Sequence, residues 1–171
     1  MNSTFDSGSR PTSGNGPGQK DPLRRMLLRS VEHSLWANRQ WVDFVYALPD
    51  PESRPRELLA HLMVGERVWF ERIAGQQIST TMFPLMEKDA LLRGFAENAE
   101  TFRGLIGSDL NVVVQFRRGT GEEYQARVED IIHHLLTHGY HHRGQLAALY
   151  ARSGVQYPNT DHINFLIENE L

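Results

Sequence analysis

The chain of 171 residues contains no cysteine. This absence excludes disulfide bonds, thiolate metal ligands and a cysteine nucleophile. Any thiol chemistry at this protein must therefore use a thiol that a second molecule supplies.

The sequence also lacks long apolar runs and a strong charge of one sign. No stretch approaches the roughly 18 apolar residues of a membrane-spanning helix. The N-terminus lacks the charged and then apolar pattern of a signal peptide. The formal net charge of −3 gives no electrostatic reason to expect nucleic acid or an anionic membrane as a partner. We therefore expect a cytoplasmic protein that binds neither.

The first residues of the chain are poor in apolar side chains. Residues 1–20 consist largely of Gly, Ser, Pro, Asn and Thr, whereas hydrophobic residues make up 40% of the whole chain. A segment of this composition buries too little surface to offset its ordering entropy. We predict a disordered N-terminal tail over residues 1–20 and one domain with a single core over residues 21–171.

Four long segments show the 3.6-residue period of amphipathic helices. They cover residues 21–47, 55–74, 87–106 and 128–152. In the first helix, Asp21 is the expected cap, Pro22 suits the first helical position, and Asn38 lies on the inward apolar stripe. Gly154 suits the left-handed position that follows the last helix. The pattern predicts an all-α fold, a four-helix bundle.

A shorter pattern interrupts the helices. Residues 111–117 are rich in β-branched and aromatic side chains, residues 122–127 form a second extended candidate, and residues 118–121 (RGTG) are a turn signal. We predict a small β-hairpin before the last long helix, packed on the bundle because two strands alone are only marginally stable. The C-terminal segment is predicted to form a short helical turn that packs through its apolar cluster, Ile163, Phe165, Leu166 and Ile167.

The last long helix carries polar residues on its inward face. The inward positions are Val128, Ile131, Leu135, His138, His142, Gln145 and Leu149. A buried polar group without a partner costs about 1–3 kcal/mol. His138 and His142 are four residues apart and project from one face, which is the spacing at which a helix presents two nitrogen ligands to one metal ion. A metal would satisfy both rings, although such a pair also arises by chance and hydrogen-bonded core histidines remain the alternative.

A third ligand must come from another element. His61 is the only histidine of the second predicted helix and lies beside its inward stripe. Glu66 is the best competitor, but its distance of five residues from His61 places it on a different face. The other histidines are expected to be surface or hydrogen-bonding residues: His33, His133, His134, His141 and His162.

The remaining polar and aromatic residues are given structural roles. Arg143 is expected to pair with a carboxylate or to cap a loop, and Gln145 either orients a ligand or bonds to the backbone. The three tryptophans, Trp36, Trp41 and Trp69, are expected in the core. No inward acid stands out as a catalytic base. A ferritin-like di-metal site is disfavoured, because paired Glu-x-x-His motifs are missing.

Residues 136–145 (LTHGYHHRGQ) resemble the His-x-x-x-His-Arg-Gly-Gln signature of the DinB-like (DinB/YfiT) family of metal-binding bundles. Three further segments resemble the family's other motifs in the same order: Trp36-Ala37-Asn38, His61 with Glu66, Trp69 and Arg72, and Pro158-Asn159-Thr160-Asp161. The likeness covers about residues 22–170. It implies an up-down-type bundle with a crossover connection, in which the hairpin precedes the last helix, and a homodimer.

The resemblance also implies that His61, His138 and His142 bind one divalent metal ion. Imidazole ligands suit zinc, nickel or iron alike. Family relatives include transferases and an isomerase that use small thiols, and hydrolases. The expected function is thus metal-dependent activation of a low-molecular-weight thiol or of water for attack on a small electrophile, as in a thiol S-transferase or hydrolase of stress or detoxification chemistry. The alternative is a non-enzymatic metal-binding or sensing bundle with a structural metal.

Overall fold

The computed structural model describes residues 21–49, 53–76, 78, 84–117 and 121–169. The tail predicted for residues 1–20 and most of the turn predicted for residues 118–121 lie outside this part. The domain boundaries therefore stay a prediction.

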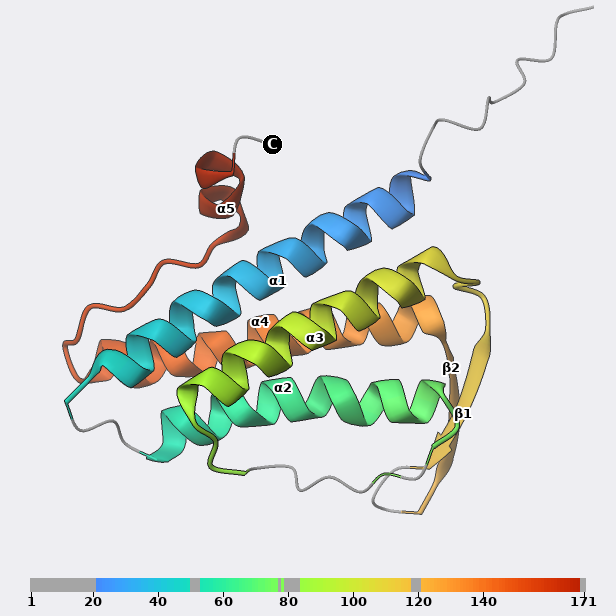
Figure 1. Cartoon of the computed structure of the whole chain (residues 1–171), viewed down its shortest axis with the longest axis horizontal. Helices are drawn as coiled ribbons and strands as arrows, with labels where there is room; N and C mark the ends of the chain where they lie inside the picture. The colour runs from blue at the N-terminus through green and yellow to red at the C-terminus, as the bar shows by residue number, and fades with distance from the viewer. Residues whose placement is uncertain (1–20, 50–52, 77, 79–83, 118–120, 170–171) are drawn as a thin grey trace, which may run out of the picture.

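Four long helices form the predicted bundle, and a short fifth helix lies beside α1 (Figure 1). They are α1 (Pro22–Ala47), α2 (Ser53–Ile73), α3 (Lys88–Gly107), α4 (Val128–Arg152) and α5 (His162–Glu168). The all-α prediction is confirmed. None of these helices combines the length and the apolar character of a bilayer-crossing segment, as far as the chain is described.

Two connections give the bundle its topology. α1 packs along α3, and α2 packs along α4. α2 and α3 run in the same direction, opposite to α1 and α4 (Figure 1), so the chain returns along the bundle between α2 and α3. α3 and α4 lie at opposite corners, so the connection between them crosses the end of the bundle and carries the hairpin.

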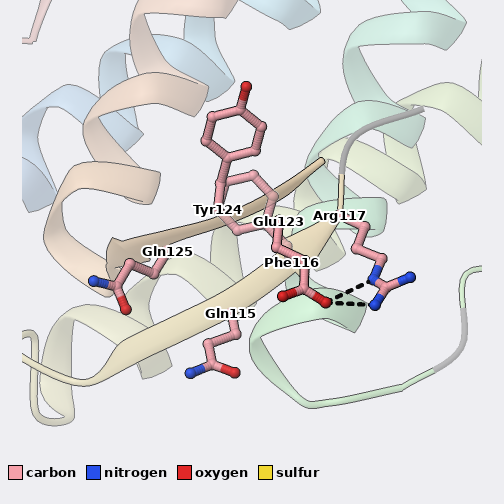
Figure 2. A pocket seen from close by; sticks show the side chains of 6 residues that line it. All are labelled: Gln115, Phe116, Arg117, Glu123, Tyr124 and Gln125. Carbon is pink, nitrogen blue, oxygen red and sulfur yellow. Dashed lines mark hydrogen bonds and ion pairs between the residues drawn. The ribbon is translucent and has the colours of Figure 1, made fainter. Parts of the chain in front are cut away.

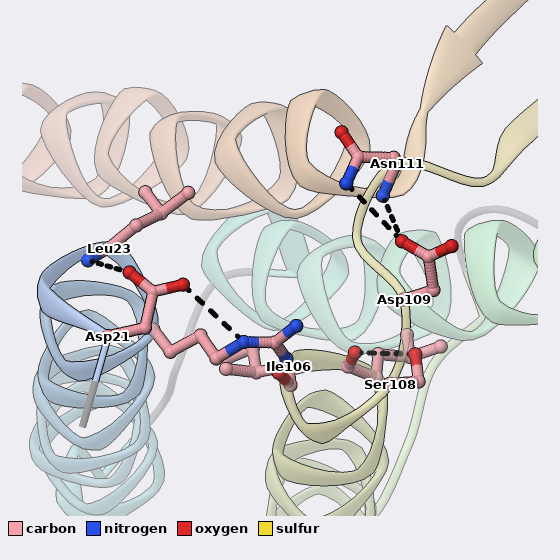
Figure 3. A network of polar contacts seen from close by, with 8 residues as sticks. Asp21, Leu23, Ile106, Ser108, Asp109 and Asn111 are labelled. Carbon is pink, nitrogen blue, oxygen red and sulfur yellow. Dashed lines mark hydrogen bonds and ion pairs between the residues drawn. The ribbon is translucent and has the colours of Figure 1, made fainter. Parts of the chain in front are cut away.

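The first turn of α1 begins at the predicted residue. The Asp21 carboxylate accepts a hydrogen bond from the backbone N–H of Leu23 at 3.0 Å (Figure 3), and Pro22 opens the helix. Proline is favourable there because the first helical N–H has no partner within the helix. Arg24 pairs with Asp21 at 3.6 Å and donates to the carbonyl oxygen of Ile106. The start of α1 is thereby tied to the end of α3.

The interior consists of two apolar clusters with a polar layer between them. One cluster contains Trp41 and Phe95, and the other contains Phe102 and Ile131 near the hairpin. Besides His33 and His61, the buried polar residues of the described chain lie between the two clusters: Ser34, Asn38, Glu66, Asn98 and Arg143. The fold therefore encloses charged groups that must find partners across the bundle.

The hairpin pairs β1 (Val113–Arg117) with β2 (Glu123–Arg127), as predicted. Phe116 lies opposite Tyr124 in the antiparallel register. Because side chains alternate along a strand, Val114 is buried against the bundle while its neighbours in β1 are exposed or half-buried. One face of the hairpin thus packs on the helices and the other meets solvent.

The C-terminal helix α5 packs through fewer residues than predicted. Phe165 is buried, but Ile163 is 60% and Ile167 is 69% exposed. The prediction that the whole apolar cluster packs on the bundle is wrong for these two isoleucines. A helix of only seven residues turns one narrow side toward α1, and Phe165 occupies that side.

Candidate metal centre

α2 and α4 place three histidine rings side by side. His61 comes from α2, and His138 and His142 come from successive turns of α4. One ring nitrogen of each lies within 4.8 Å of the other two, and the Nε2 atoms of His138 and His142 are 3.0 Å apart. His61 is buried, whereas the other two rings are half-buried. The structure therefore brings together the three histidines selected from the sequence.

The donor set and the spacing fit one divalent ion. Imidazole nitrogens bind zinc at about 2.0–2.1 Å, so two ligands of one ion lie within roughly 4.2 Å of each other. His138 and His142 already meet this limit. The ring nitrogen of His61 lies within 4.8 Å of the other two, which is close to this limit. The cluster could therefore hold a metal ion.

The electrostatics keep the rings of His138 and His142 in the form that a metal requires. Burial, with the nearby rings of His142 and His61, lowers the pKa of His138 to about 4. Burial also lowers the pKa of His142, although its hydrogen bond to Gln145 acts in the opposite direction. A neutral imidazole has a nitrogen lone pair available for a ligand bond.

Gln145 fixes the orientation of the His142 ring. Its Oε1 lies 2.9 Å from Nδ1 of His142, and its Nε2 lies 3.0 Å from Nε2 of His141. With the amide oxygen accepting from Nδ1–H of His142, the lone pair of that ring is on Nε2, which faces His138. Gln145 thus bonds to the rings of two histidines, and its role in orienting a metal ligand stays a prediction.

The model of one protein family, described as the DinB family, matches residues 22–170. The match spans all five helices and all three clustered histidines. The chain belongs to the DinB family. Members of this family generally bind metal ions, and the histidine cluster of this DinB-family bundle agrees with that property. A search of the curated proteins finds no match.

The other histidines of this DinB-family chain lie outside the cluster. The His141 ring lies 5.1 Å from the ring of His142, and the His134 ring lies 5.7 Å from the ring of His138. His33 is fully buried and donates from Nε2 to the carbonyl oxygen of Thr160 at 2.8 Å, while Nδ1 lies 3.0 Å from the Tyr140 hydroxyl. His33 therefore holds the C-terminal segment against α1, a hydrogen-bonding role as predicted. Of the remaining histidines, His133 and His141 are exposed and His162 is half-buried.

The prediction that no inward acid stands out is wrong, because Glu66 is buried in the polar layer with only 7% of its surface exposed. It accepts a hydrogen bond from Nδ2 of Asn98 at 2.7 Å. Burial raises the pKa of Glu66 to about 7, although the bond from Asn98 and the charge of Arg143 act in the opposite direction. The sequence signal was its place one turn after the buried Leu62.

Arg143 has different partners from those predicted. Its Nη1 donates to Oδ1 of Asn38 at 2.8 Å and lies 3.4 Å from Oγ of Ser34. The guanidinium therefore crosses from α4 to α1 instead of binding a carboxylate directly or capping a loop. Burial lowers its pKa to about 10, and Glu66 opposes this effect.

The tryptophans divide into one core residue and two at the surface of the core. Trp41 is buried, as predicted. Trp36 is half-buried and donates to Glu168 at 3.2 Å. Trp69 is also half-buried, because one side of its ring packs on the core while another part lines a pocket. The prediction that Trp36 and Trp69 lie in the core is therefore only partly correct, because each is half-buried.

Proposed function

We propose that His61, His138 and His142 bind one divalent metal ion, and that this centre activates a small thiol or a water molecule for attack on an electrophile. The observation that supports the proposal most strongly is the convergence of three imidazole nitrogens within 4.8 Å of one another. Zinc, nickel and iron all suit this donor set.

An open coordination position is what makes the proposed centre catalytic. Three protein nitrogens leave at least one position of a four-coordinate ion free, as in catalytic and not closed structural sites. The half-buried His138 and His142 leave the cluster within reach of small molecules. When bound, a metal ion lowers the pKa of a water or thiol ligand.

The residues of the chain supply orientation. Gln145 holds the His142 ring with its Nε2 toward His138, and the buried position of His61 restricts the motion of the third ring. No side chain of this cysteine-free protein can act as the thiol. The thiol must therefore be a cosubstrate of low molecular weight.

The proposal is tested by turnover. Metal-loaded protein is assayed with small thiols or water and a panel of electrophilic acceptors, beside His138→Ala. His133→Ala is the matched control, since His133 is an exposed histidine of the same helix. We expect the rate to be lost in His138→Ala and kept in the control. Equal rates for wild type and His138→Ala would refute the catalytic centre.

A structural metal is the second candidate, because the cluster joins two helices. His61 is on α2, and His138 and His142 are on α4, so one ion would cross-link them. In that case a chelator lowers the melting temperature, and no thiol or water reaction is found with any acceptor. A saturable rate that depends on the metal would exclude this alternative.

The proposal has three further parts: a homodimer, which the family resemblance implies, a cytoplasmic location, and a role in stress or detoxification chemistry, which the proposed reaction would suit. The dimer is tested by light scattering of the eluted protein. A mass equal to a single chain at micromolar concentration would contradict it.

A further inference from the structure

A pocket lies between the hairpin and the two helices that carry the histidines. Its volume is about 300 Å³, which is at the lower end of the range for small-molecule sites, about 300–1,000 Å³. We name it the hairpin pocket. It is lined by Trp69, Phe116, Tyr124, Ala126, Asp130, Ile131 and His134.

The walls of the hairpin pocket are mainly aromatic, and they hold one another in place. The Trp69 and Phe116 rings meet edge to face, with centroids 4.8 Å apart and planes at 74°. Phe116 and Tyr124, which are opposite each other across the strands, are stacked at 6.1 Å. The guanidinium of Arg72 lies 4.6 Å from the centroid of the Trp69 ring, where it supports that wall.

The hairpin turns its ring-bearing face toward this pocket. In Figure 2 the Tyr124 ring rises on the side of the helices, whereas Gln115 and the Glu123–Arg117 ion pair lie on the other side of the strands. A wider pocket of about 540 Å³ follows the hairpin itself and also includes Phe116 and Tyr124.

One lining residue of the pocket, His134, is a neighbour of the histidine cluster. The His134 ring packs edge to face on Trp69 at 5.5 Å and lies 5.7 Å from the ring of His138. A group held against Trp69 and His134 is thus separated from a candidate metal ligand by a single imidazole ring. His134 and His138 lie on successive turns of α4.

We propose that the hairpin pocket binds the flat, aromatic part of the electrophilic substrate and so directs its reactive atom toward the histidine cluster. This inference rests on the proposed function only in calling the ligand a substrate; binding in the pocket does not require the metal. Aromatic pairs in edge-to-face or offset geometry contribute about 0.5–1.5 kcal/mol beyond burial of area. An aromatic ligand should therefore bind roughly two- to tenfold more tightly than its saturated analogue.

The test uses benzamide and cyclohexanecarboxamide, which differ in ring flatness but are both neutral. Each is titrated into metal-free, full-length protein while the three indole N–H signals are followed by NMR and assigned with Trp69→Phe. Trp41 donates to Thr160, and Trp36 donates to Glu168, both away from the pocket. These two signals serve as internal controls. We expect benzamide to shift the Trp69 signal saturably and the other two little.

Substitutions at the hairpin test the walls. Phe116→Ala should weaken benzamide binding by roughly two- to tenfold. Phe116→Leu keeps apolar bulk, so the hairpin stays packed, and should weaken benzamide binding in the same direction. Gln115→Ala is the matched control, because it changes the neighbouring residue on the outer face. A Trp69 response that is absent, equal for the two amides, or unchanged in both Phe116 variants would overturn the proposal.

A separate zinc titration of the same proteins distinguishes this inference from the proposed function. The Phe116 variants should bind zinc as the wild type does. Zinc binding without a Trp69 response to benzamide refutes the hairpin pocket alone. A Trp69 response in wild-type protein that binds no zinc refutes the metal centre alone.

Discussion

Replacement of Glu66 by glutamine should change how the stability of the protein depends on pH. Glu66 is buried, and burial raises its pKa from 4.5 to about 7. Between these two values the folded state binds more protons than the unfolded state. The free energy of unfolding therefore falls as the pH rises from 4.5 to 7, and the loss stays constant above pH 7. The Glu66→Gln variant has no proton to release and lacks this loss.

The size of the effect follows from the shift. A difference of 7 − 4.5 = 2.5 pKa units corresponds to about 3 kcal/mol at roughly 1.36 kcal/mol per unit. Most of this loss, about 2.5 kcal/mol, falls between pH 5 and pH 8. The stability of Glu66→Gln relative to wild type should therefore rise by about 2–3 kcal/mol over this interval.

Urea unfolding followed by circular dichroism, with a chelator present, measures the difference at pH 5, 6, 7 and 8. Burial lowers the pKa of His138 and His142, so these histidines raise the free energy of unfolding as the pH rises through the same interval. Because both proteins contain them, this contribution cancels in the difference between Glu66→Gln and wild type. Glu97→Gln is the control, since Glu97 is 67% exposed. If the free energy of unfolding of Glu66→Gln changed with pH in the same way as that of the wild type, ionisation of Glu66 would not destabilise the folded state, and the prediction would be wrong.

Three further predictions concern the site and its frame. Gln145→Ala should weaken zinc binding by about 10–100-fold in calorimetry, and an effect no larger than that of His141→Ala would contradict the orienting role. Asp21→Ala should lower the free energy of unfolding by about 1 kcal/mol in chemical denaturation; an unchanged midpoint would show that the cap is unimportant. Phe165→Ala should speed hydrogen exchange of the α5 amides far more than Ile167→Ala does, since only Phe165 is buried. Equal rates in these two variants would contradict the packing of α5.

The helices were predictable because their signals are local. The apolar period, Asp21 before Pro22, and Gly154 after α4 lie within each element, and the observed helix bounds agree with the predicted ones within two residues. Gly154 adopts a φ of 69°, the left-handed conformation expected after the helix. The convergence of His138 and His142 is likewise a consequence of helical spacing.

The missed features depend on contacts between distant segments. An acid next to an apolar stripe is normally solvated, and Glu66 is buried because α3 supplies Asn98 as a hydrogen-bond donor. The partners of Arg143 come from α1, where Asn38 on the predicted inward stripe was the visible signal. The hairpin pocket requires the position of the strands relative to α2 and α4, which no local pattern of one segment contains.

The metal content of the purified protein tests the central claim most directly. Untagged protein, prepared without a metal-affinity column, is analysed for zinc, nickel and iron in the wild type, His61→Ala and His133→Ala. The three-histidine centre predicts about one equivalent of metal in the wild type and in His133→Ala, and its loss in His61→Ala. One equivalent that persists in His61→Ala, or a wild type that binds no divalent metal even when metal is added, would contradict the account.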